Sequence, residues 1–167
     1  QNTKLLLAPR FSLLYNITSA TSFYGVISKG FSPPTLAEVR PSTNQFYNLQ
    51  PEYGWNFEAG IKGSVLQNFF LFDASVYSFK LQHAIVSQTD STGADFFVNT
   101  GSIKENGIEV WIDARIIQNK KTFISNISVT NSFTYQPYKF NNYTSGTKNY
   151  AGNNLTGVPK NINVTTL

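Results

Sequence analysis

The residues able to do chemistry in this chain are few, and their types exclude most forms of catalysis. The sequence contains one histidine, His83, and no cysteine. It therefore cannot build a histidine-based metal cluster or a Cys–His nucleophile, since each needs side chains that it lacks. No serine stands in the spacing of a nucleophile elbow, and no glycine run has the spacing of a phosphate-binding loop. We expect a protein that is not an enzyme and that holds no metal and no cofactor.

Charged side chains instead recur at every second position among apolar ones. Glu58 and Lys62 share one parity in residues 55–63, while Trp55, Phe57 and Ile61 share the other. Side chains of one parity in a strand point to one face of the sheet. The charged residues that this pattern, here and in two later stretches, assigns to a polar face are Glu58, Lys62, Asp73, Glu109, Asp113 and Arg115. We expect Glu58 to pair there with a basic group such as Lys62 or Arg115.

The composition fits strands whose polar surface is mostly neutral. Charged residues make up 13% of the 167 residues, about half the share usual in soluble domains, and aromatic residues make up 15%. The net charge of +4 comes from scattered side chains, so we expect no nucleic-acid partner. No apolar stretch approaches the roughly 20 residues of a membrane helix. Contact with a membrane would therefore be made by strands.

About seven strands are expected, joined by connections that alternate between short and long. The alternating or apolar stretches are residues 5–17, 22–30, 55–63, 69–86, 108–116, 123–135 and 160–167. Pro9 indicates an edge, a bulge or a strand start. Short turns are expected near residues 18–22, 64–68 and 118–122, and long connections near 30–53, 87–106 and 139–160. This rhythm is typical of an antiparallel membrane barrel, which has tight turns on one rim and long loops on the other.

Four phrases, in order, resemble consecutive barrel segments of TonB-dependent outer-membrane receptors. They are KGFSPPTLAEV (29–39), LQPEYGWNFEAGIKG (49–63), FDASVYSFKLQHAIV (72–86) and VNTGSIKENGIEVWIDARI (98–116), and NNLTGVPKN (153–161) resembles a later strand entry of the same family. Each phrase is weak alone, and the ordered series is more specific. The resemblance implies an all-β fold, an antiparallel meander of about seven long strands that forms part of a 22-stranded transmembrane β-barrel.

The resemblance also implies a role and a setting. Residues 1–167 would be one internal segment from the C-terminal half of the barrel, about a third of it, with the plug domain and the remaining strands absent from this chain. The function implied is an outer-membrane receptor of a Gram-negative bacterium that binds a ferric siderophore, or a similar bulky and scarce ligand, and imports it. The partners implied are outer-membrane lipid, the iron chelate, and the TonB–ExbB–ExbD complex, which would act through the plug and supply energy. The six charged residues named above would then line the barrel lumen.

Several residues match the family phrases and are expected to act structurally. Pro33 and Pro34 would hold the first long loop extended, and Gly30 would let the chain leave its strand at an angle closed to other residues. Pro51 would start a strand because no neighbour needs its missing N–H. The full set carried over from the resemblance is Gly30, Phe31, Pro34, Pro51, Glu52, Gly60 and Gly107.

Ligand recognition would come from the long loops, which are rich in aromatic rings and neutral amides. Such groups suit flat chelates or sugars, and an arginine suits an anionic chelate. The candidate ligand-binding residues are Arg40, Phe46, Tyr47, Phe96, Phe97, Tyr143 and Tyr150. The same rings could instead pack one loop against another. The acidic D-N-G-D-G type of segment, typical of the family's sugar-importing branch, has no counterpart here, which favours iron chelates.

Two alternatives of other classes stay open at this point. A passive porin-like channel or an adhesin barrel would share the strand pattern but would have no plug of about 150 residues, a typical domain size. A soluble β-sandwich carbohydrate-binding module would pack the rows 55–61 and 108–116 on a second sheet.

Overall fold

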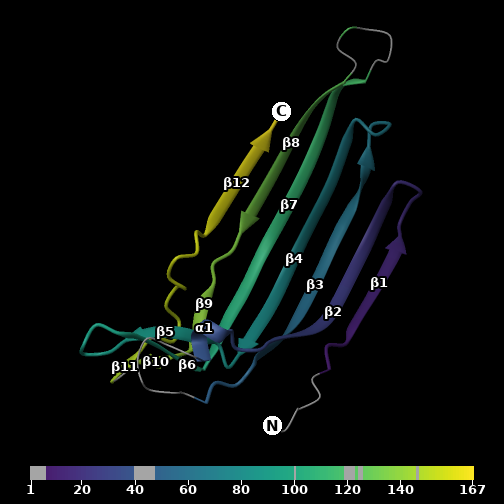
Figure 1. The fold of residues 1–167 in the computed structure, drawn as a ribbon. Helices are drawn as coiled ribbons and strands as arrows, with labels where there is room; N and C mark the ends of the chain where they lie inside the picture. The colour runs from purple at the N-terminus through teal and green to yellow at the C-terminus, as the bar shows by residue number, and fades with distance from the viewer. Residues whose placement is uncertain (1–6, 40–47, 100, 119–122, 124–125, 146) are drawn as a thin grey trace.

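The chain folds into one large antiparallel sheet, shown by a computed structural model (Figure 1). The structure describes residues 7–39, 48–99, 101–118, 123, 126–145 and 147–167. The strands of the main sheet are β1 (Arg10–Asn16), β2 (Thr21–Ser32), β3 (Glu52–Val65), β4 (Phe70–Gln82), β7 (Ser102–Gln118), β8 (Asn126–Tyr135) and β12 (Asn161–Thr166). They lie side by side in that order, and β9 (Lys139–Asn142) pairs with β7 off this path. The prediction of an antiparallel meander of about seven long strands is confirmed.

The sheet has two faces of opposite chemistry, because directly opposed residues of paired strands point to the same side. One register row reads Tyr24, Gly60, Ser75, Glu109 and Thr134 across β2, β3, β4, β7 and β8. We call the side that carries it the polar face. The neighbouring row on the other side, the apolar face, reads Phe23, Ile61, Ala74, Val110 and Phe133.

The apolar face is not covered by any other part of the described chain. Phe57 is 52% exposed and Ile108 is 42% exposed. A soluble sandwich would need these rows to pack on a second sheet, and within the described residues no such packing is present. No helix among the described residues has the length and apolar character needed to cross a membrane.

Two glycines of the polar face make room for aromatic rings on the neighbouring strands. A Cβ added at Gly60 would meet the Tyr24 ring, and one added at Gly107 would meet the Tyr77 ring. Each tyrosine lies directly opposite its glycine in the register. An aromatic ring laid over a strand glycine covers backbone that would otherwise be bare. This explains why Gly60 and Gly107, both taken from the family phrases, cannot readily be other residues.

The short and long connections leave the sheet at opposite ends, as the alternation predicts (Figure 1). Residues 17–20 join β1 to β2, and residues 66–69 join β3 to β4. The described residues of the long connections 33–51, 83–101 and 136–160 gather at the other end, which we call the long-loop end. Most of the predicted turn at 118–122 lies outside the described residues.

The first long connection contains a single helical turn, α1 (Leu36–Val39), which begins with a capping box. The Glu38 side chain accepts a hydrogen bond from the Thr35 backbone N–H at 2.6 Å. The Glu38 N–H donates to the Thr35 hydroxyl at 3.4 Å. This reciprocal pair satisfies two N–H groups that a helix start leaves free. Pro33 and Pro34 stand just before it, so the proline-rich stretch leads into an ordered turn.

The expected strand over residues 69–86 is wrong only at its last four residues. β4 ends at Gln82, and His83 has a left-handed backbone with a φ of 55°. The chain then forms a separate hairpin of β5 (Ile85–Thr89) and β6 (Asp95–Asn99). An alternating, apolar sequence runs through His83 without interruption, so the pattern gave no sign of the break. The long connection predicted over 87–106 is therefore mostly this hairpin and the start of β7.

The one buried hydrophobic cluster among the described residues is small and lies at the long-loop end. Ala84, Ile103 and Phe140 are buried together. Partly buried side chains of β4 and of the third long connection pack against them: Leu81, Tyr143, Tyr150 and Leu155. The third connection also contains the short pair β10 (Thr144–Ser145) and β11 (Lys148–Asn149). The chain thus has a loop core at one end and a wide sheet with no core of its own.

Candidate functional site

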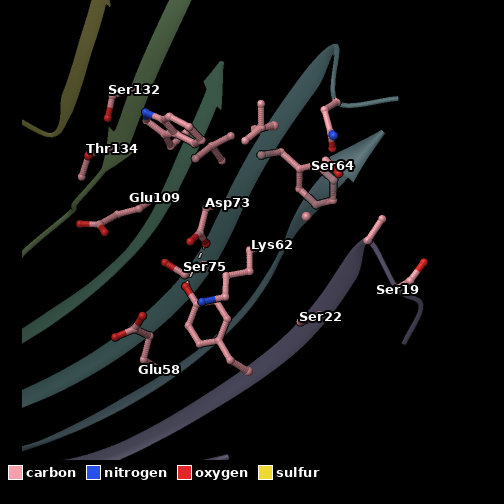
Figure 2. A pocket seen from close by; sticks show the side chains of 18 residues that line it. Ser19, Ser22, Glu58, Lys62, Ser64, Asp73, Ser75, Glu109, Ser132 and Thr134 are labelled. Carbon is pink, nitrogen blue, oxygen red and sulfur yellow. Dashed lines mark hydrogen bonds between the residues drawn. The ribbon is translucent and has the colours of Figure 1, made fainter. Parts of the chain in front are cut away.

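The polar face forms an open hollow of about 900 Å³ that spans five strands. Figure 2 shows Glu58, Lys62, Asp73 and Glu109 directed into it from β3, β4 and β7. Hydroxyl groups fill the space between the charges: the lining includes Ser22, Tyr24, Ser64, Ser75, Ser132 and Thr134. The sequence pattern placed these four charged residues on one face, and the structure brings them to one hollow.

Tyr24 and Asp73 lie at the centre of this hollow. The Tyr24 hydroxyl donates a hydrogen bond to the Asp73 carboxylate at 3.0 Å, shown as a dashed line in Figure 2. The Lys62 ammonium group lies 5.5 Å from the centroid of the Tyr24 ring. A cation over the face of a tyrosine ring is attracted by the ring's quadrupole. One residue from each of three adjacent strands is thereby held in a fixed arrangement.

Asp113 and Arg115 form an ion pair nearer the opposite end of the sheet, where the short turns lie, which we call the short-turn end. The Arg115 Nε donates to the Asp113 carboxylate at 3.2 Å, and the Thr130 hydroxyl donates to its other oxygen at 3.1 Å. The expected pairing of Glu58 with Lys62 or Arg115 is not seen, because Arg115 binds Asp113 and Lys62 lies over Tyr24. Within the described part of the chain, neither Glu58 nor Glu109 makes a hydrogen bond or an ion pair through its carboxylate.

Asn99 links two long connections at the long-loop end through hydrogen bonds that the sequence pattern did not predict. Its side-chain oxygen accepts a hydrogen bond from the Gln50 N–H at 2.7 Å. Its amide nitrogen donates to the backbone oxygens of Gln50 at 2.9 Å and His83 at 2.7 Å. Glu52 adds a second link, since its carboxylate accepts a hydrogen bond from the Ile85 N–H at 2.7 Å. These bonds hold residues 50–52 against the β5–β6 hairpin.

The predicted ligand-binding residues fall into three groups. Arg40, Phe46 and Tyr47 lie outside the described residues. Phe96 and Phe97 lie next to each other on β6 and are half-buried.

Tyr143 and Tyr150 stack on each other with ring centroids 5.4 Å apart, and Phe140 lies 4.8 Å from Tyr143. Tyr143 and Tyr150, the third group of predicted ligand-binding residues, therefore pack within the loop core.

The remaining residues taken from the family phrases lie at the ends of β2 and β3. Pro51 stands immediately before β3, as expected of a strand start. Gly30 differs from expectation: β2 continues past it to Ser32, it pairs with Gly54, and its backbone is not in the left-handed region. Phe31 is 41% exposed on the apolar face. Pro34 leads into the capping box described above.

His83 is part of the loop structure. Its ring meets the Tyr53 ring edge-on at a centroid distance of 5.2 Å. In the ranges that the structure describes, no three histidine or carboxylate side chains come together in a way that could hold a metal ion. The polar face can therefore offer hydrogen bonds and charge to a passing solute or to a packed domain.

The comparisons with known proteins agree with this architecture. Residues 2–165 match the family described as TonB dependent receptor-like, beta-barrel, so the chain belongs to that family. The family is one of receptors and transporters and is not a class of enzymes.

Solved structures of similar fold include three outer-membrane or import receptors. The alcaligin outer membrane receptor FauA of Bordetella pertussis superposes with a TM-score of 0.64 at 15% identity, over 98% of this chain. The pyoverdine outer membrane receptor FpvA of Pseudomonas aeruginosa PAO1 gives 0.61 at 19% identity over 95% of this chain. The ferric-catecholate import receptor Fiu of E. coli K12 gives 0.59 at 18% identity over 81%. The chain spans 26%, 21% and 18% of those three receptors.

Proposed function

We propose that this chain is part of the barrel of an outer-membrane receptor that binds a ferric siderophore or a similar bulky, scarce chelate and imports it. The observation that supports this best is the two-faced sheet with all its long connections at one end. An uncovered apolar face fits lipid, and a polar face lined by hydroxyls and charges fits a barrel interior. The likeness to receptors for alcaligin, pyoverdine and ferric catecholates points to the class of ligand.

In this account the long-loop end is where ligand is captured. Hydrogen bonds through Asn99 and Glu52 order residues 50–52 and the hairpin, so that part of the binding surface is formed before ligand arrives. Preorganisation of this kind lowers the entropy lost on binding. Phe96, Phe97 and the first long connection, with Arg40, Phe46 and Tyr47, are the proposed contacts for the chelate. Tyr143 and Tyr150 contribute by supporting the third connection.

The polar face would line the route of the ligand through the barrel and would contact the plug domain. Glu58 and Glu109 are carboxylates without partners in the described chain, and basic groups of a plug domain would complete them. Transport would then proceed by binding at the long-loop end, followed by movement of the plug driven by TonB from the inner membrane. The 22-stranded closure and the plug belong to this proposal, as does the location in the outer membrane.

The proposal is tested by ligand binding to the intact protein that carries this chain, purified from outer membranes in detergent. Tryptophan fluorescence would be followed as ferric hydroxamates, ferric catecholates and cobalamin are added. We expect saturable binding of at least one ferric chelate, with no binding of its iron-free form at the same concentration. A variant in which residues 90–94, the tip of the β5–β6 hairpin, are replaced by Gly–Ser should bind more weakly. Absence of binding by every ferric chelate would contradict the assignment of the ligand class.

A further inference from the structure

A row of lysines crosses the apolar face just below the long-loop end. Lys29 on β2 is opposite Trp55 on β3, which is opposite Lys80 on β4. Lys80 is opposite Lys104 on β7, and Lys104 is opposite Lys139 on β9. Opposed residues share a face, so these side chains form one continuous line across five strands. We call Lys29, Lys80, Lys104 and Lys139 the lysine row.

The carboxylates of these strands lie on the opposite face of the sheet from the lysine row. By register, the carboxylates of β3, β4 and β7 all lie on the polar face: Glu52, Glu58, Asp73, Glu105, Glu109 and Asp113. None of them is therefore available to neutralise the lysine row. Among the described residues, none of the four lysines forms an ion pair. The Lys29 ammonium group lies 5.4 Å from the centroid of the Tyr53 ring, which orients it without neutralising it.

Like charges directly opposite each other in a sheet are unfavourable. Lys80 and Lys104 are such a pair, and Lys104 and Lys139 are a second. Their side chains are exposed, so an anion from outside could lie between them. A phosphate group offers enough oxygens to accept hydrogen bonds from several ammonium groups at once. The arrangement is thus one that an added phosphate would stabilise.

Apolar hollows adjoin the row on the same face. One of about 650 Å³ is lined by Ile27, Tyr53, Trp55, Phe57 and the stem of Lys80, among others. A second of about 490 Å³, lined by Phe11, Leu13 and Val76, shares Ile27 and Phe57 with the first. Small residues on this face, Gly25 and Ala59, leave the space between the larger side chains. A chain of methylene groups fits such a groove, and it would run away from the lysines toward the short-turn end.

We propose that the lysine row and these hollows bind a phosphorylated, multiply acylated glycolipid of the outer leaflet. The phosphates would lie on Lys80, Lys104 and Lys29, and an acyl chain would lie along Ile27 and Phe57. The occupant is a lipid because the basic line and the apolar groove are adjacent, in the order of a headgroup and its tail. The proposal rests on the outer-membrane location proposed above. It adds a lipid contact that is separate from the capture of ligand.

The test measures lipid retained by the intact protein in nanodiscs of phosphatidylcholine doped with lipid A. Lipid A bound after size-exclusion chromatography is quantified by mass spectrometry. Each lysine near an anionic lipid surface contributes to lipid binding. The loss of one such lysine should weaken the affinity roughly fivefold. We expect Lys80→Gln and Lys104→Gln each to show this loss, and the triple variant with Lys29→Gln to lose about a hundredfold. The matched control is Lys62→Gln on the polar face, which should retain lipid A as the unaltered protein does.

Further measurements distinguish this proposal from its alternatives. Lipid A stripped of phosphate should be retained as weakly as phosphatidylcholine. Equal retention of the two forms, or unchanged retention in the triple variant, would overturn the proposal and leave only a general lipid contact. A change of oligomeric state in the triple variant, with lipid A retention unchanged, would assign the row to a second copy of the protein instead. Heat-modifiable migration on gels shows which variants are folded, and only those are compared. Chelate binding is measured on the same samples, so failure of the receptor function is seen separately.

Discussion

Tyr24 donates a hydrogen bond to Asp73 at 3.0 Å while its ring covers Gly60. The strand between them, β3, supplies both the glycine under the ring and Lys62 above it. A side chain at position 60 would displace the Tyr24 ring and break the hydrogen bond to Asp73. The polar face is therefore organised by direct cross-strand contacts.

Gly60→Ala should destabilise the protein by about 1–3 kcal/mol, because the added Cβ meets the Tyr24 ring. The measurement is thermal unfolding of the intact protein in detergent, followed by circular dichroism. Gly30→Ala is the matched control, since a Cβ there meets nothing within 4 Å. Equal effects of the two substitutions would show that the ring does not lie on Gly60.

The Tyr24–Asp73 hydrogen bond should be visible in a double-mutant cycle. Tyr24→Phe and Asp73→Ala each remove one partner, and the two effects should fall short of additive by about 1.5–3 kcal/mol, the range for a hydrogen bond to a charged group. The free energies come from urea unfolding in lipid vesicles. Strict additivity would mean that the two side chains do not interact.

Asn99→Ala should loosen the long-loop end without unfolding the sheet. The substitution removes three hydrogen bonds to Gln50 and His83. Hydrogen exchange should become faster at residues 48–50 and 85–99, while β3 and β4 keep their protection. Asn154→Ala, an exposed amide in the third connection, is the control. Faster exchange throughout the sheet would show that Asn99 supports the fold as a whole.

The tip of the β5–β6 hairpin should loosen in acid. Hydrogen bonds from the Thr92 hydroxyl and from the Ala94 and Thr92 N–H groups lower the pKa of Asp90. A lowered pKa means that the folded hairpin favours the ionised carboxylate. The stabilisation is therefore present above the usual carboxyl pKa of about 3.9 and is lost as the pH falls through the lower folded value.

The exchange rates of the Thr92 and Ala94 amides, corrected for intrinsic pH dependence, test this between pH 7 and 2. Protection should decrease at the acid end of that range in the unaltered protein. It should be low at every pH in Asp90→Ala. A protection profile independent of pH would contradict the role assigned to the carboxylate.

The sequence predicted the two faces well because a sheet with one apolar and one polar face imposes a strict period of two. Glu58, Lys62, Asp73 and Glu109 lie on the expected face for this reason. The connections could also be located, since their prolines and amides break the period.

The failures have a different physical origin, because they depend on contacts between distant segments. The break at His83 depends on a hydrogen bond from its N–H to the Gly101 oxygen and on Asn99, 16 residues further along the chain. The pairing of Arg115 with Asp113 is instead local, because the two residues stand two positions apart on β7 and so point to the same face. The lysine row is equally hidden, since parity gives each lysine a face but only the register aligns them.

The central claim is that the protein imports a ferric chelate with energy from TonB. The most direct measurement is uptake of radioactive iron by iron-starved cells, supplied as the chelate that the purified protein binds. Cells with the gene should accumulate iron, while cells lacking either the gene or TonB should not. Uptake that needs the gene and persists without TonB would contradict the claim, and the protein would then be a passive channel.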